Sequence, residues 1–254
     1  MKLGAQLYSL RHECDTPQRL YSCLKKVKEI GYDNVQASGI CAIDGQLLRS
    51  YSDELQLPIG CTHRPFAEIT EQTDKCIEFH RAIGCDVIGL GMMPAEYQND
   101  YEGLVSLCNM LKEPIKKITD AGLRFAYHNH ALEFKSYGDI RIIDYMISEL
   151  PDLDFIFDVY WSTYAGADTE KYIRLLSNEG RLNHIHFKDM KALPQGAICA
   201  CGDGVIDFRA LTRLSLECGI ENVYVEQDNA PDFDAYNEMT KSYKHIKEIF
   251  EAEM

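Results

Sequence analysis

The sequence predicts an α/β fold, specifically a single (β/α)8 TIM barrel that forms one domain over residues 1–254. Short β-prone runs alternate along the chain with longer stretches whose apolar residues lie three or four positions apart. Such runs recur about every 31 residues, and the 254-residue length is that of one barrel. The eight runs begin near Leu3, Asn34, Ile59, Val87, Arg124, Asp154, Leu182 and Asn222.

A doubly wound open sheet is the alternative fold. It usually carries a glycine-rich phosphate loop after its first strand, and the segment Tyr8–His12 is not one.

The helical stretches carry start and stop signals. In the first, Thr16 can cap the helix, Pro17 takes the first helical position and Gly31 ends it. The fourth contains Pro114, where we expect a kink or a break. Apolar stripes mark the helices, for example Leu20, Leu24, Val27 and Ile30; Leu104, Leu107, Leu111, Ile115 and Ile118; Ile143, Met146, Ile147 and Leu150; and Tyr236, Met239, Tyr243, Ile246 and Phe250.

Composition narrows the class of protein. A net charge of −14 argues against nucleic acid or an anionic membrane as partner. No run of 18 apolar residues is present, so we expect no transmembrane helix. Gln6 and Ser9 interrupt the apolar stretch at the start, which therefore does not resemble the apolar centre of a signal peptide. Most of the ten cysteines lie in apolar periodic segments, where a thiol acts as a small core residue. We expect a cytoplasmic protein with free thiols.

Candidate chemistry lies where the strands end, because the active sites of TIM barrels are at the carboxyl ends of the strands. The polar or small residues at these ends, in chain order, are Gln6 and Tyr8; Gln36 and Ser38; Thr62, His63 and Arg64; Gly89 and Gly91; Tyr127, His128, His130 and Glu133; Asp158 and Trp161; His184, His186, Lys188 and Asp189; and Glu226 and Asp228.

Three of these residues point to a divalent metal ion. Asp158, His186 and Glu226 each close an apolar run, and oxygen and nitrogen donors on neighbouring buried strands suit such an ion. A carboxylate such as Glu226 would be costly to bury without a compensating charge. Asp158 can instead cap a helix, but Val159–Trp161 follow before any helical pattern. His184 and His186 share a strand face, and we expect the outer His186 to be the ligand.

Several other residues keep two interpretations. His63 either contacts substrate or supports its loop, and Trp161 either forms an apolar wall for a sugar ring or plugs the barrel. Lys188 either holds an oxyanion or phosphate or lies on the surface. The loop 200–204, with Asp207, is a tight turn that can also close over substrate.

The chain resembles the xylose isomerase-like TIM-barrel superfamily, the sugar phosphate isomerases and epimerases. The resemblance is carried by Gly4–Ser9, Ala126–Phe134, Phe157–Trp161, His184–Asp189, Gly202–Phe208 and Tyr224–Asp228. It implies one Mn²⁺, Mg²⁺, Co²⁺ or Zn²⁺ held by a Glu, Asp, His, Glu set, and hence Asp158, His186 and Glu226 as ligands.

The fourth ligand departs from the family pattern. Many relatives have a glutamate where this chain has His128, and Glu133 is the nearby carboxylate. We therefore expect Glu133 as the fourth ligand, with His128 as an alternative ligand or as a catalytic acid or base.

The resemblance implies an isomerase or epimerase that removes the proton next to a sugar carbonyl while a metal ion stabilises the enediolate. Glu226 would be both ligand and base, and His128 or Glu133 would act on the other face of the sugar. The expected substrate contacts are Gln6, His63, His130, Trp161, Lys188 and Asp228. The expected partner is a small carbohydrate, and a homo-oligomer is possible.

Two other functions stay open. A lyase would use the same enolate to expel a leaving group, as in inosose dehydratases or enzymes acting on 3-keto-glycosides. A sugar-binding barrel without turnover would need no ligand set. DNA-repair endonucleases share the superfamily but use a richer ligand set for three zinc ions, to which Asp203 and Asp207 contribute no evident Asp-x-His pair. The negative charge is also wrong for DNA.

Overall fold

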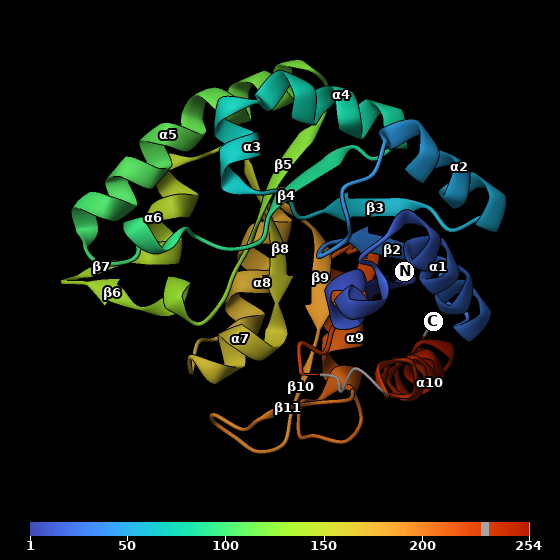
Figure 1. The fold of residues 1–254 in the computed structure, drawn as a ribbon. Coiled ribbons are helices and arrows are strands. Elements are labelled where there is room, and N and C mark those ends of the chain that lie inside the picture. The colour runs from blue at the N-terminus through green and yellow to red at the C-terminus, as the bar shows by residue number, and fades with distance from the viewer. Residues whose placement is uncertain (230–233, 254) are drawn as a thin grey trace.

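Eight parallel strands form a nearly closed barrel in the computed structural model, which describes residues 1–229 and 234–253 (Figure 1). The order around the barrel is β3-β2-β1-β12-β9-β8-β5-β4, and the backbone N–H of Arg64 donates to the carbonyl of Gly89 at 2.8 Å where β3 meets β4. The strands are β1 (Lys2–Gln6), β2 (Asn34–Ala37), β3 (Ile59–Thr62), β4 (Val87–Leu90), β5 (Arg124–His128), β8 (Leu153–Asp158), β9 (Leu182–Phe187) and β12 (Asn222–Val225). Each begins within one residue of its predicted start, so the TIM barrel is confirmed and the open sheet is wrong.

Helices surround the barrel, and α10 packs against α1 where the two ends of the chain meet (Figure 1). The helices are η1 (Leu7–Glu13), α1 (Pro17–Ile30), α2 (Gly45–Leu55), α3 (Phe66–Glu71), α4 (Thr73–Ile83), η2 (Ala95–Tyr97), α5 (Tyr101–Asp120), η3 (Leu132–Phe134), α6 (Ile142–Glu149), α7 (Val159–Tyr164), α8 (Thr169–Asn178), α9 (Phe208–Glu217) and α10 (Ala235–Glu253). Two short hairpins lie in the loops: β6 (Ser136–Tyr137) with β7 (Ile140–Arg141), and β10 (Asp189–Met190) with β11 (Ile198–Cys199).

The first helix forms as predicted from its sequence. Thr16 Oγ1 accepts a hydrogen bond from the N–H of Arg19 at 3.3 Å, and Pro17 is the first helical residue. Gly31 ends the helix with φ of 119°, a conformation that a residue with a side chain avoids.

Pro114 does not break α5, which contradicts one of the two outcomes predicted for it. The helix runs from Tyr101 to Asp120 through Pro114. Pro114 and the apolar residues Leu111 and Ile115 are all buried, and their packing holds the helix together despite the backbone hydrogen bond that proline cannot donate.

The barrel interior and the outer layer have separate apolar clusters. A cluster with one residue from each of five strands fills the interior: Cys61, Val87, Ala126, Ile156 and Tyr224. The larger cluster lies between the strands and the helices. All ten cysteines are free, as predicted. No helix in the described part of the chain is long and apolar enough to cross a membrane.

Candidate active site

Four adjacent strands each place one titratable side chain at the same end of the barrel. Glu226 follows β12, and His186, Asp158 and His128 lie on β9, β8 and β5, which are neighbours in that order. The pairing register sets His186 opposite both Asp158 and Tyr224. All four residues are at most 5% exposed. We call them the four-residue group.

The donor atoms of this group converge, and all of them lie within 4.8 Å of one another. Asp158 Oδ2 is 3.5 Å from His128 Nε2 and 3.8 Å from His186 Nδ1. Glu226 Oε2 is 4.0 Å from His128 Nε2 and 2.9 Å from His186 Nδ1. Two donors bonded to one ion at about 2.1 Å lie at most about 4.2 Å apart, so these four separations fit a single ion.

Each histidine of the group is held by its other ring nitrogen. His128 Nδ1 donates to the carbonyl of Gly91 at 3.1 Å, because a carbonyl can only accept. His186 Nε2 donates to Oε1 of Gln36 at 2.5 Å. In the neutral ring the remaining nitrogen of each therefore carries its lone pair toward the carboxylates. Protein oxygens orient metal-ligating histidines in this way.

Asp158 serves as both a helix cap and a member of the group, although its sequence context had argued against a cap. Helix α7 begins directly after it, and Asp158 Oδ1 accepts from the N–H of Trp161 at 2.9 Å. Asn129 fixes its backbone, accepting from the Asp158 N–H at 3.0 Å and donating to the carbonyl at 3.3 Å. Asp158 Oδ2 and His128 Nε2 are buried without a hydrogen-bond partner, so a cation has two free donors to bind.

The two buried carboxylates of the group favour binding of a cation. Burial opposes ionisation of Glu226, but Lys188 and His186 hold its pKa well below the ordinary range. Burial also disfavours protonation of His186, yet Glu226 and Asp158 raise its pKa to about 9. These carboxylates attract a proton to the nitrogen where a metal ion would bind. A divalent ion would therefore displace that proton and offset both negative charges.

Lys188 is a buried part of the site, so the surface interpretation is wrong. Its side chain is 1% exposed, and Nζ lies 2.6 Å from Asp228 Oδ2 and 3.5 Å from Glu226 Oε2. The Trp161 ring covers the ammonium, with its centroid 5.1 Å from Nζ. Burial alone would lower the pKa of Lys188, but Glu226 and the neighbouring aspartates raise it above the ordinary value. Lys188 therefore stays charged.

Glu133 is not brought to the four-residue group, which argues against its predicted roles as ligand and catalytic residue. It is fully buried, and its Oε1 accepts from the hydroxyl of Tyr127 at 2.5 Å while Oε2 accepts from the N–H of His130 at 2.7 Å. Burial raises the pKa of Glu133, although both hydrogen bonds oppose that rise. Glu133 supports the turn after β5, and the fourth member of the converging group is His128.

A cavity of about 460 Å³ opens beside the group; we call it the rim cavity. Of the predicted substrate contacts, His63, His130, Lys188 and Asp228 line it. Trp161 lies just behind, with its ring 5.2 Å from that of His130. Gln6 is fully buried at the end of β1, where its Oε1 accepts from the N–H of Tyr8 at 3.2 Å. The described residues that line it are Tyr8, Ser38, His63, Arg64, Pro65, Phe66, Leu90, Gly91, Met92, His128, His130, Lys188, Glu226 and Asp228.

His63 joins the site through a chain of hydrogen bonds that sequence reasoning missed. Gln36 Nε2 donates to His63 Nε2 at 2.7 Å, so His63 Nδ1 carries the proton and donates to Ser38 Oγ at 3.2 Å. Gly91 leaves room for this ring, because a Cβ there would come 2.8 Å from His63 Nδ1. The signal that could have revealed Gln36 is its place on a buried strand, where an amide needs partners. His184 lies one layer below, stacked on Tyr224 at 5.9 Å.

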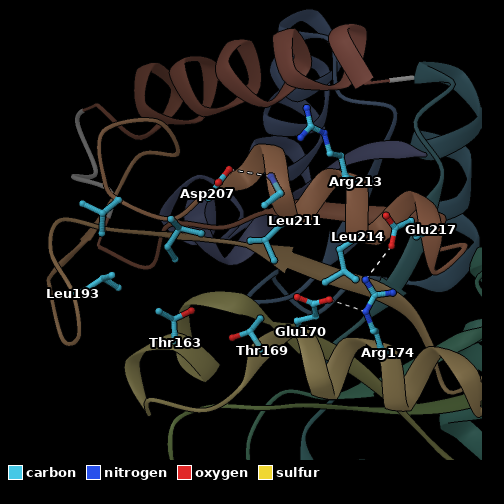
Figure 2. Close-up of a pocket in the computed structure, with 13 residues that line it drawn as sticks. Thr163, Thr169, Glu170, Arg174, Leu193, Asp207, Leu211, Arg213, Leu214 and Glu217 are labelled. Atoms are coloured by element: carbon cyan, nitrogen blue, oxygen red, sulfur yellow. Dashed lines mark hydrogen bonds and ion pairs between the residues drawn. The ribbon is translucent and has the colours of Figure 1, made fainter.

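A second cavity, of about 540 Å³, lies on the outer surface between α8 and α9 (Figure 2). Arg174 pairs there with Glu170 at 2.8 Å and with Glu217 at 3.0 Å. Its lining contains no histidine or cysteine, and its glutamates are already paired. Asp207 at its edge caps α9, accepting from the N–H of Ala210 at 2.9 Å. The four-residue group therefore borders the rim cavity and not this one.

Residues 24–248 match the family model of the xylose isomerase-like TIM barrel, so the chain belongs to that family. A sugar phosphate isomerase/epimerase from Parabacteroides distasonis is similar with a TM-score of 0.78 and 20% identity, over 98% of this chain and 95% of that one. A D-tagatose 3-epimerase-like protein gives a TM-score of 0.74 and 19% identity, over 100% and 98%. The probable 3-DHS dehydratase AsbF of Bacillus anthracis has a TM-score of 0.76 and 12% identity, over 97% of this chain and 99% of that one.

No curated protein sequence matches the chain. At these identities, the likeness to solved structures establishes the fold and leaves the reaction to the site's own geometry.

Proposed function

We propose that this member of the xylose isomerase-like TIM-barrel family is a divalent-metal-dependent sugar isomerase or epimerase with the four-residue group as its metal site. The observation that carries the proposal is the donor set: four buried donors on adjacent strands, two of them without a partner. Two imidazoles and two carboxylates suit Mn²⁺, Co²⁺ or Zn²⁺ better than Mg²⁺, which prefers oxygen ligands. When bound, the ion polarises the sugar carbonyl and stabilises the charge that develops as the adjacent carbon loses its proton.

Proton transfer is proposed for the two carboxylates that line the rim cavity, Glu226 and Asp228. Glu226 keeps the role of base predicted from the sequence. Burial, together with Glu226, raises the pKa of Asp228 to about 6, so near neutral pH this carboxyl can both accept and donate a proton. Lys188 holds Asp228 in place and keeps a positive charge beside developing negative charge on the sugar.

The test combines metal content with proton exchange. Protein dialysed against Mn²⁺ should retain one equivalent per chain and should exchange deuterium from D₂O into the carbon next to a ketose carbonyl. Asp158→Ala should lose both properties while staying folded by circular dichroism. A wild-type protein that binds no Mn²⁺, Co²⁺ or Zn²⁺ would refute the proposal.

β-Elimination is the second candidate, because it begins with the same proton removal. The position of Asp228 supports it, since this carboxyl lines the cavity with Oδ1 unpartnered and can protonate a departing hydroxyl there. The two reactions differ in product: an epimerase returns an isomeric sugar of equal mass, whereas a lyase releases water or an aglycone. Mass spectrometry of the product distinguishes them.

A further inference from the structure

We propose that the rim cavity takes a neutral, unphosphorylated sugar and that Glu68 sets this preference by neutralising Arg64. This inference rests on the proposed function, because it names the substrate class of the same site. It is carried by the ion pairs of the cavity's cations, by the charge balance of the site and by the polar atoms left without partners.

Both cationic side chains in the cavity lining are already paired. Arg64 donates from Nε at 2.9 Å and from Nη2 at 2.5 Å to Oε2 of Glu68, which lies in α3. The two side chains are only 23% and 36% exposed. Lys188 is bound to Asp228 as described above. Phosphate recognition needs an arginine or lysine whose charge is not already neutralised by a carboxylate, and neither cation in the described lining meets this condition.

Among the described residues of the site, the fixed charges leave no positive charge to balance a phosphate. Asp158, Glu226 and Asp228 are three carboxylates, and Lys188 with one divalent ion supplies three positive charges. A sugar phosphate brings about −1.5 to −2 more at pH 7, into a partly desolvated cavity. The chain as a whole carries −14 and repels such an anion further. A neutral sugar meets no such penalty.

What the cavity does offer suits hydroxyl groups and C–H faces. His130 Nδ1 and Asp228 Oδ1 are buried in its wall without hydrogen-bond partners, and a sugar hydroxyl can satisfy either. Large apolar side chains face the opening, among them Tyr8 at 40% exposed and Met92 at 56% exposed. Apolar walls with a few convergent polar atoms are typical of sites for small molecules.

Among the residues that the structure describes, Arg11 is a further cation near this rim. Its Nη1 donates to the backbone carbonyls of Tyr8 at 2.9 Å and Asp228 at 3.2 Å, and its guanidinium covers the Tyr8 ring. Arg11 is not among the residues that line the cavity.

The experiment compares matched substrates on Mn²⁺-loaded protein. Deuterium exchange is measured by NMR for D-ribulose against D-ribulose 5-phosphate and for D-fructose against D-fructose 6-phosphate. We expect kcat/KM to be at least tenfold higher for the neutral sugar of whichever pair reacts. Glu68→Gln releases Arg64 and should move this ratio about tenfold toward the phosphate, the value of one charge-assisted hydrogen bond of about 1.4 kcal/mol. Glu71→Gln, on the exposed end of the same helix, should leave the ratio unchanged.

Binding of unreactive analogues separates this inference from the proposed function. Ribitol and ribitol 5-phosphate have no carbonyl, so calorimetry measures their affinities whether or not the protein turns over a ketose. Tighter binding of ribitol supports the inference, even if no ketose exchanges and the isomerase proposal fails. Tighter binding of the phosphate would overturn it, as would a ratio unaffected by Glu68→Gln, and Arg11→Gln would then identify the phosphate ligand.

Discussion

The substitution Glu133→Gln decides between a brace and a metal ligand. The glutamine carbonyl oxygen can replace only one of the two accepting oxygens of Glu133. The backbone N–H of His130 can only donate, so it takes that oxygen, whereas the Tyr127 hydroxyl can reverse and accept from the new amide. The hydroxyl hydrogen then loses its acceptor in a fully buried place. One bond to a charged group becomes neutral and one donor is unsatisfied, which costs about 1–3 kcal/mol of unfolding free energy.

The assay pairs urea unfolding with elemental analysis after dialysis against Mn²⁺. We expect Glu133→Gln to lose about 1–3 kcal/mol of stability and to keep one equivalent of metal, because Glu133 lies outside the four-residue group. Asp158→Ala is the matched control that should lose the metal. If Glu133→Gln instead lost its metal at unchanged stability, Glu133 would be a ligand and the assignment of His128 would fail.

Three further predictions concern other parts of the molecule. Gln36→Leu removes the acceptor that orients His186 and should weaken Mn²⁺ binding by about 10- to 100-fold in a chelator competition; unchanged affinity would contradict this orientation. Burial lowers the pKa of His80 to about 4. As the pH falls from 7 to 5, His80 therefore takes up a proton in the unfolded chain before it does so in the folded chain, and the free energy of unfolding falls by about 2 kcal/mol. In urea unfolding, the free energy of unfolding of His80→Gln should change with pH by about 2 kcal/mol less than that of the wild type. The same change in both proteins would exclude His80 as the source of the pH dependence. Removing the metal with a chelator should lower the melting temperature, and Mn²⁺ at 100 times its Kd should restore about 2.7 kcal/mol, whereas a Tm insensitive to Mn²⁺ would argue against a site in the folded state.

Regular features of the fold were predictable because local signals and tertiary packing agree in them. The start of α1 follows from Thr16 and Pro17, whose effects act within one turn of the helix. The strand starts follow from β-prone runs that are buried on both faces. Pro114 shows the limit of a local rule: the buried face of α5 outweighs the missing hydrogen bond, and that burial depends on residues far away in the sequence.

The candidate site was only partly predictable, because side chains beyond a strand take whichever buried partners the fold provides. Glu133 lies in η3, after β5 has ended, so strand geometry says nothing of its direction. The position of the Glu133 side chain depends on its hydrogen bonds with the Tyr127 hydroxyl and the His130 N–H. Gln36 was a candidate from its place at a strand end, but its partners His63 and His186 are 27 and 150 residues away.

Alternation along the strands identifies His128 without knowledge of those contacts. Side chains two residues apart on a strand share a face. Ala126, Ile156 and Tyr224 belong to the cluster that fills the barrel, and His184 stacks on Tyr224. Two residues beyond them, in the direction of the rim, come His128, Asp158, Glu226 and His186, and the four-residue group is therefore the next layer above the interior packing. Glu133 has no such relation to Ala126, so the same rule that fixes the three other members selects His128 as the fourth.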